Sequence, residues 1–193
     1  MRIESLEQSD AVLVEAAQQG RLDSFGALYQ RYHNPIVALA YAQLGDKHSA
    51  EDAAQEVFAI ACRDLRSLRE RDKFGAWLGG ICRNVTKQML RVKTRTALLP
   101  CSTPALGGDP SRGRLGHMEQ EEQWDAVRKA VWKLPESERE LVVMRYFNGF
   151  SQARISQVLD MTPAAVNGKL TRAKRRLAEL LERDGFGSES WDA

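Results

Sequence analysis

The sequence predicts an all-α protein: two small helical domains joined by a flexible linker, the second containing a helix-turn-helix. Three observations support this fold class. Apolar residues recur at steps of three and four in the long segments, which is the period of an amphipathic helix. No segment alternates apolar and polar residues as a half-buried strand does. A stretch rich in proline and glycine interrupts the helical pattern near the middle of the chain.

This stretch gives the domain boundaries. Residues 97–118 contain Pro100, Pro104 and Pro110 among several glycines and show little apolar periodicity. Such a segment buries too little surface to fold and is typical of a flexible linker. We therefore assign residues 1–96 to a first domain and residues 119–193 to a second, each long enough for a small helical core.

The first domain is expected to contain four helices, over residues 9–20, 23–45, about 48–65, and from about 72 to at least 92. Ser9-Asp10 and Asp23-Ser24 can cap the first two. Pro35 should kink or split the second. The fourth has an apolar face at helical spacing: Phe74, Trp77, Leu78, Ile81, Cys82, Val85, Met89 and Val92. Trp77 could be a stacking platform for a base, but its place on this face favours a core role.

The second domain is expected to contain helices over residues 119–133 and 136–147, then one after Gly149 and one after Thr162. Ser151 can cap the third, residues 160–162 make a turn, and Pro163 suits the first turn of the fourth. The last helix has a narrow apolar stripe of Val166, Leu170, Ala173, Leu177 and Leu180. This pattern predicts a helix-turn-helix whose second helix can enter a major groove.

Charge is sorted along the chain, although the net charge is only +2. Residues 81–100 and 163–178 contain no acid, and each stretch contains five basic residues. The acids collect elsewhere, notably in the third expected helix and directly after the linker. One basic helix alone would be interpreted as a solvated face, but two of them, one in each domain, indicate a protein that touches a polyanion at two places.

Composition excludes several other classes. Three cysteines without a CxxC pair argue against a disulfide framework and fit a reducing cytosol, with Cys62 and Cys82 expected in the core. The three histidines lack metal-binding spacing and there is no phosphate-binding glycine loop, so no metal, cofactor or enzymatic activity is expected. No apolar run approaches the roughly 20 residues of a membrane span, so we expect a cytoplasmic protein without membrane insertion.

Three motifs resemble the extracytoplasmic-function (ECF) group of bacterial sigma factors, in the order and spacing of that family. GDKHSAEDAAQEVFAIA (Gly45–Ala61) is similar to its core-polymerase-binding helix. FGAWLGGICRN (Phe74–Asn84) is similar to the helix that contacts the proximal promoter element. The segment Leu134–Leu177 is similar to the domain that reads the more distant element. The resemblance implies a transcription initiation factor that binds core RNA polymerase, directs it to promoters and helps to open DNA.

The resemblance also implies roles for particular residues. Core polymerase would be bound by Glu51, Asp52, Gln55 and Glu56. The proximal element, including non-template single strand, would be bound by Asn84, Lys87, Gln88, Arg91 and Arg95, the Asn84 amide serving an unstacked base. The distal element would be read as duplex by Ala164, Asn167, Lys169, Arg172, Arg175 and Arg176. An anti-sigma protein would be a further partner.

The chain departs from the family pattern at several positions. Gly79-Gly80 stand where larger helix-forming residues are usual, Gln88 where an acid is common, and Arg154 where a glutamate is usual; Asn167-Gly168 replace a more basic pair. We expect the fold to tolerate these changes, whereas the promoter sequence of relatives need not carry over. The alternative function is a conventional helix-turn-helix repressor or activator acting without polymerase. That alternative does not explain a second basic helix beside an acidic one.

Overall fold

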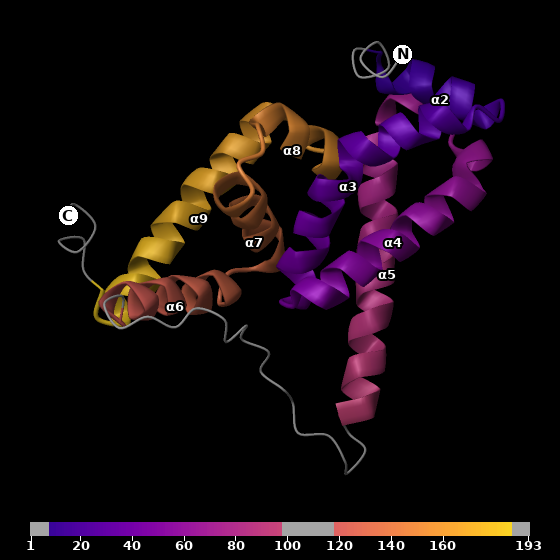
Figure 1. The fold of residues 1–193 in the computed structure, drawn as a ribbon. Coiled ribbons are helices and arrows are strands. Elements are labelled where there is room, and N and C mark those ends of the chain that lie inside the picture. The colour runs from indigo at the N-terminus through magenta and orange to yellow at the C-terminus, as the bar shows by residue number, and fades with distance from the viewer. Residues whose placement is uncertain (1–7, 98–117, 187–193) are drawn as a thin grey trace.

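The computed structural model describes residues 8–97 and 118–186, and every regular element within these ranges is helical (Figure 1). The first part contains α2 (Asp10–Gln18), α3 (Leu22–Leu44), α4 (Lys47–Asp64) and α5 (Phe74–Ala97), with short 3-10 turns η1 (Leu65–Ser67) and η2 (Arg71–Lys73) before α5. The second contains α6 (Met118–Trp132), α7 (Glu136–Val142), the π-helical turn η3 (Val143–Phe147), α8 (Gln152–Leu159) and α9 (Pro163–Arg183). The all-α prediction is confirmed. The linker stretch 98–117, which includes Cys101, lies outside the described residues.

Helix α3 differs from the sequence prediction at its start and at Pro35. It begins at Leu22, with Arg21 rather than Asp23 or Ser24 in the N-cap position. Pro35 lies inside the helix and does not split it. A proline within a helix costs about 3 kcal/mol, but α3 is buried on both sides of it, including Tyr32 before it and Ile36 after it, which have no exposed surface. Packing of the flanking turns therefore keeps the helix continuous.

Two residues expected in the core of the first part are exposed instead. Cys62 is exposed because Val57, Ala61 and Leu65, at steps of four, occupy the buried face of this segment. Val92 is 64% exposed because the C-terminal half of α5 extends past the other helices (Figure 1). Cys82 is buried as expected, and loss of hydration raises the pKa of its thiol to about 12.

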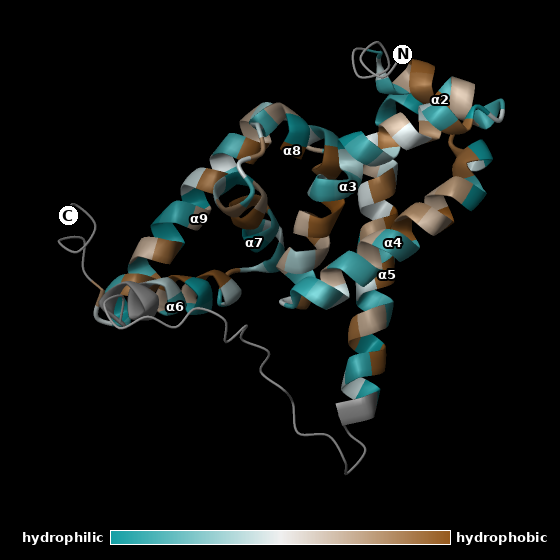
Figure 2. Ribbon diagram, viewed as in Figure 1, coloured by the Kyte–Doolittle hydropathy of each residue, from teal (hydrophilic) through white to brown (hydrophobic). Residues whose placement is uncertain are grey.

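The apolar core continues from the first part into the second. Leu13, Leu28, Leu39, Val57 and Leu78 form one buried cluster with side chains of α7, η3 and α8. The members from the second part include Leu141, Met144, Ile155, Val158 and Leu159. Figure 2 shows apolar stripes along helices that also carry hydrophilic faces. Each helix is therefore amphipathic, and the two parts bury apolar surface against each other.

After α7 the chain continues as a π-helical turn instead of an α-helix. Residues 136–147 were expected as one helix, but residues 143–147 form the π-helical turn η3. The side-chain amide of Asn148 donates to the Val143 carbonyl at 3.0 Å, and Arg145 Nη1 donates to the Phe150 carbonyl at 2.9 Å. The two bonds give side-chain donors to the carbonyl at the start of η3 and to the one just before α8, and so help to fix the chain between α7 and α8.

Helix α4 begins with a side-chain cap at Asp46, earlier than the sequence suggested. The Asp46 carboxylate accepts hydrogen bonds from the Ser49 backbone amide at 2.9 Å and from the Ser49 hydroxyl at 2.6 Å. These two bonds hold the pKa of the Asp46 carboxyl below its usual value of 3.8. The ionised carboxylate is thus the form that stabilises the start of the acidic helix.

We expect Asp46→Ala to lower the free energy of unfolding by about 1 kcal/mol at neutral pH, because an N-cap acceptor is lost. Since the folded-state pKa is lowered, the charged form stabilises the fold above the unfolded value of 3.8. This contribution is lost as pH falls through the lowered pKa. Urea unfolding at pH 7 and pH 3 measures both effects. Asp46→Asn is the control, since asparagine keeps a cap acceptor that does not titrate; equal stability of wild type and Asp46→Ala at pH 7 would contradict the cap.

Candidate nucleic-acid interface

Helix α5 presents the predicted proximal-element residues on an exposed face. Its buried face includes Phe74, Leu78 and Cys82, which have no exposed surface. The exposed residues lie on a different face at helical spacing: Asn84, Lys87, Gln88, Arg91 and Arg95. The half of α5 that carries most of them projects beyond the body of the molecule (Figure 1). The structure thus brings these five residues together as one accessible stripe, rich in amides and cations, which suits a nucleic-acid strand.

Trp77 packs inward, although this side chain was also considered as a stacking platform. The residue is half-buried against the main core, and its ring centroid lies 5.9 Å from that of Phe74. Phe74 in turn contacts the ring of Tyr32 edge-on at 5.4 Å. These aromatic contacts fix the start of α5 against α3 and favour the core interpretation of Trp77.

Helices α8 and α9 form the predicted helix-turn-helix, with caps at both helix starts. The Ser151 hydroxyl accepts from the Arg154 amide at 3.2 Å, and the Thr162 hydroxyl accepts from the Ala165 amide at 3.2 Å. Between the helices Asp160 adopts a left-handed conformation with φ of 54°. An aspartate tolerates this conformation better than most residues, and it ends α8 so that α9 can turn away.

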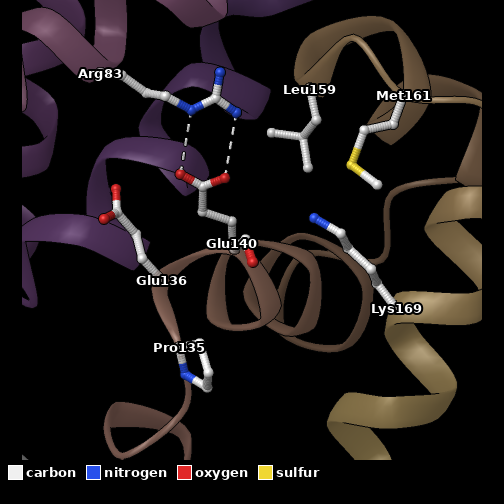
Figure 3. Close-up of a pocket in the computed structure, with 8 residues that line it drawn as sticks. Arg83, Pro135, Glu136, Glu140, Leu159, Met161 and Lys169 are labelled. Atoms are coloured by element: carbon white, nitrogen blue, oxygen red, sulfur yellow. Dashed lines mark hydrogen bonds and ion pairs between the residues drawn. The ribbon is translucent and has the colours of Figure 1, made fainter.

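The predicted distal-element residues lie on α9, and most of them are exposed. Val166, Leu170 and Ala173 are buried, so the other faces of the helix are available to a ligand. The exposed members of the predicted set are Ala164, Asn167, Arg172, Arg175 and Arg176. Lys169 differs, because it is half-buried and faces a crevice between the two parts of the protein (Figure 3).

Some of these side chains already have protein partners. Arg176 Nη1 lies 2.8 Å from the Glu138 carboxylate of α7, and Arg175 Nε lies 3.8 Å from Glu179 one turn along α9. The Asn167 side-chain oxygen is 3.5 Å from the Gln152 amide. Among the described residues, none forms a hydrogen bond or ion pair with the exposed Arg172 side chain, which makes Arg172 the distal-element cation best placed for a direct DNA contact.

Helix α4 carries the acidic face predicted to bind polymerase. Its buried residues include Ala50, Ala53, Ala54 and Val57, which pack against α3 and α5. The predicted polymerase-binding residues are exposed on the remaining surface: Glu51, Asp52, Gln55 and Glu56. Exposed acid on α4 is therefore separated from exposed base on α5 and on residues 164–176 of α9, as the sequence indicated, and the exposed acids of α9 lie only in its last turns.

A crevice of about 540 Å³ lies between α5, α7 and the helix-turn-helix. Its lining includes Arg83, Glu136, Glu140 and Lys169 (Figure 3). Arg83 reaches the Glu140 carboxylate with Nε at 3.4 Å and Nη2 at 3.3 Å. Arg83 was not predicted as a site residue, because Glu140 lies 57 residues further on and no sequence spacing connects the two.

Lys174 is a second basic residue without a predicted role. Its ammonium group lies 5.3 Å from the centre of the Tyr146 ring, and both side chains are exposed. Proximity to an aromatic face provides a favourable cation–π contact on the outer side of α9. The acid-free composition of residues 163–178 was the available signal for this residue. Within the described ranges no cluster of side chains could hold a metal ion, and no helix is long and apolar enough to cross a membrane.

Comparison with known proteins identifies the family. Residues 28–96 match the model of sigma-70 region 2, and residues 124–177 match that of sigma-70 region 4. The chain is 30% identical over 175 residues to the ECF RNA polymerase sigma factor SigM of Mycobacterium tuberculosis, covering 91% of this chain and 86% of SigM. It is 30% identical over 181 residues to the ECF sigma-E factor of Escherichia coli, covering 88% of this chain and 92% of that protein.

Other relatives agree with this assignment. BldN of Streptomyces coelicolor, an ECF RNA polymerase sigma factor, is 31% identical over 178 residues, which are 89% of this chain and 66% of BldN. Solved structures share the fold. CnrH in complex with the cytosolic domain of CnrY matches with a TM-score of 0.60 at 24% identity, over 92% of this chain and 99% of that one. The sigma factor RpoE in complex with the anti-sigma factor NepR from Bartonella quintana matches with a TM-score of 0.54 at 22% identity, over 82% and 96%.

The fold and the two basic helices are typical of a helical DNA-binding protein. Its sequence matches are more specific: the chain belongs to the ECF family of RNA polymerase sigma factors. It is thus a transcription initiation factor that binds core polymerase and directs it to promoters. The repressor alternative is not favoured, because the match includes region 2 as well as the helix-turn-helix. Sigma factors are regulatory transcription factors without catalytic activity.

We expect Arg172→Ala to weaken recognition of the distal element by about 1–3 kcal/mol if Arg172 contacts a base. Binding of the holoenzyme would be measured on promoters selected from a random-sequence library, with the distal element intact or scrambled. Arg183→Ala is the control, because Arg183 is an exposed arginine at the far end of α9. An Arg172→Ala holoenzyme with unchanged affinity and unchanged preference for the intact element would refute the contact.

Proposed function

We propose that three helices divide the work of promoter recognition. The acidic face of α4 docks on core polymerase, the stripe on α5 captures the proximal element as it opens, and α9 reads the distal element as duplex. The observation that carries this proposal is the segregation of exposed charge, with acid on α4 and cations on α5 and α9. Surfaces of opposite sign on separate helices can engage a protein and a polyanion at once.

The stripe on α5 suits single-stranded DNA. Asn84 offers both a donor and an acceptor, which an unstacked base edge requires, and it is exposed near the middle of α5, beside the buried Val85 and Thr86. Lys87 and Arg91, one turn apart, follow it along the projecting half of the helix. Their spacing allows the cations to track successive phosphates of the same strand. Gln88 and Arg95 complete this proposed site.

The helix-turn-helix suits duplex DNA. Ala164, Asn167 and Arg172 lie in the first turns of α9, which is the part of a recognition helix that meets base edges. Arg175 and Arg176 lie further along and suit phosphate contacts. Residues 1–96 and 119–193 would thus be the two promoter-binding domains, joined by a linker over residues 97–118.

The remaining assignments follow from family membership. We infer that an anti-sigma protein binds this chain, as NepR binds RpoE in the solved complex of the same fold. We also infer a cytoplasmic location, where the polymerase is, and no enzymatic activity of its own. Reconstitution tests the function as a whole: the purified chain should confer promoter-specific transcription on core polymerase. Tight sequence-specific binding to duplex DNA by the free chain, without effect on core polymerase, would instead indicate a repressor.

We expect Asn84→Ala to impair promoter opening more than formation of the initial polymerase–promoter complex. The amide can serve a base only after the duplex unstacks, which costs a few kcal/mol, so loss of one base contact shifts the open fraction. Permanganate footprinting of the holoenzyme on its promoter measures the opening. Thr94→Ala, further along the exposed half of α5 and outside the proposed site, is the control. An unchanged footprint with Asn84→Ala would remove this residue from the opening step.

We expect the double substitution Asp52→Lys and Glu56→Lys to weaken binding to core polymerase, since the acidic face of α4 becomes basic. Both side chains are exposed, so the fold should be retained. Fluorescence anisotropy of the labelled chain with core polymerase measures the affinity. Glu179→Lys with Glu182→Lys reverses two exposed acids on α9 and controls for net charge. If both double variants bind core polymerase equally well, α4 is not the docking helix.

A further inference from the structure

We propose that Lys174 of α9 and Tyr146 of η3 form a phosphate-binding site on one flank of the helix-turn-helix. In this site Lys174 binds a phosphate of the distal-element duplex, and the Tyr146 ring positions the Lys174 ammonium group. The ligand is the DNA backbone and not a base, so the site sets the register and orientation of α9 on the duplex. The proposal rests on the proposed function of α9.

Lys174 is an exposed cation held by an aromatic ring. Its ammonium group lies 5.3 Å from the centre of the Tyr146 ring, and Tyr146 is 50% exposed. Within the described ranges no carboxylate forms an ion pair with Lys174, in contrast to Arg176, which pairs with Glu138. An aromatic face attracts an ammonium group without neutralising it and leaves N–H donors free for an anion. Lys174 therefore keeps its full charge for a phosphate.

The chain before α8 holds Tyr146 in a fixed place. Val143 and Met144, at the start of η3, are buried. The Arg145 side chain donates to the Phe150 carbonyl at 2.9 Å, and the Phe150 backbone amide donates to the Met144 carbonyl at 3.1 Å. These contacts anchor the chain on both sides of Tyr146 while the ring stays exposed. π-helical turns of this kind occur frequently at functional sites.

Helix α9 carries cations on two flanks of its exposed surface. Its buried stripe runs from Val166 to Ala173. Residues seven apart in an α-helix return to nearly the same flank, so Lys174 lies two turns beyond Asn167 on one side. Arg172, two residues before Lys174, projects about 160° away around the helix. All three side chains are exposed, so both flanks are open to a ligand.

The flank of Lys174 is the one that borders the start of α8. The Asn167 side-chain oxygen lies 3.5 Å from the side-chain amide of Gln152, the first residue of α8. Tyr146, just before α8, contacts Lys174 on the same side. In a helix-turn-helix bound to DNA the first helix crosses the phosphate backbone while the second enters the major groove. The surface made by these four residues therefore faces the backbone that α8 crosses.

Two cationic flanks match the shape of a major groove. The groove is about 12 Å wide and has a phosphate backbone on either side. Lys174 supplies a contact on one side of α9, whereas Arg172 and Arg176 lie toward the other. Contacts on both flanks hold the helix at one depth and angle, which directs its first turns onto the base edges.

Tyr146 contributes because a lysine side chain is flexible. A free lysine loses rotamer freedom when a ligand fixes it, and this loss weakens binding. Contact with the Tyr146 ring restricts the Lys174 side chain before DNA binds, so less freedom is lost on binding. Tyr146 is therefore a positioning residue, which acts through Lys174 and needs no contact of its own with DNA.

The first experiment measures how promoter affinity depends on salt. Holoenzymes carrying the wild-type chain or Lys174→Ala are titrated with a promoter selected from a random-sequence library, at increasing potassium chloride concentrations. Each phosphate contact adds about 0.9 to the salt exponent of the binding constant. Lys174→Ala should lower the exponent by about 0.9 and the affinity at about 0.1 M salt by about eightfold, with unchanged sequence preference. Lys174→Arg keeps a cation and should restore the exponent.

Lys129→Ala is the control for loss of a positive charge. Lys129 is an exposed lysine of α6 that lies near Asp184, at the far end of α9 from the helix-turn-helix. This variant should keep the wild-type salt exponent. Binding of the labelled chain to core polymerase, followed by fluorescence anisotropy, should be the same for Lys174→Ala and Lys129→Ala, because the proposed ligand is DNA.

The second experiment isolates the role of the Tyr146 ring. Tyr146→Leu removes the ring and should weaken promoter binding by about threefold, the cost of ordering a free lysine side chain. Tyr146→Phe keeps the ring face and should bind as the wild type does. In a chain that already carries Lys174→Ala, Tyr146→Leu should cause no further loss, because the residue acts through Lys174.

A wild-type salt exponent for Lys174→Ala would overturn the phosphate site, and so would weaker binding of this variant to core polymerase. A loss with Tyr146→Phe as large as that with Tyr146→Leu would assign the effect to the hydroxyl and overturn the positioning role. Arg172→Ala separates this site from the function of α9. If only Arg172→Ala weakens recognition, α9 reads the distal element without the site; if neither variant has an effect, the function proposed for α9 fails.

Discussion

The approach of the α8 backbone to Gly79 is the contact on which the arrangement of the other surfaces depends. Because position 79 has no Cβ, the last turn of α8 lies directly against α5, and Ile155 and Val158 enter the apolar core of the first part. The same approach brings Glu140 to Arg83 and Gln43. Gly79 and Arg154 both lie at this junction.

Separation of charge explains how a protein with a net charge of +2 can serve both a protein partner and DNA. Acid collects on the exposed side of α4, while α5 and α9 keep most of their cations exposed, apart from Arg83 and Lys169 at the crevice. Each helix achieves this with an ordinary amphipathic pattern, in which one face is apolar and a stretch of the exposed face carries one sign of charge. The fold then only has to hold three such helices with their charged faces outward.

Local features were predicted well because neighbouring residues determine them. The cap at Ser151, Pro163 in the first turn of α9 and the apolar stripe from Val166 to Ala173 appear as expected, whereas Ser9 makes no side-chain cap and α3 begins after Arg21. Features that depend on what covers a helix were predicted less well. Cys62 and Val92 are exposed, and Pro35 does not split α3, because packing partners rather than local sequence decide burial and continuity.

The sequence by itself determined the helical class, the charge of each helix and the family, because periodicity and motif spacing are properties of contiguous residues. Only the tertiary structure revealed the Glu140 network, the crevice that receives Lys169 and the need for glycine at position 79. Each of these joins residues far apart in the chain, such as Arg83 and Glu140 at a separation of 57 residues. Their geometry depends on how two amphipathic parts pack, and no local pattern encodes it.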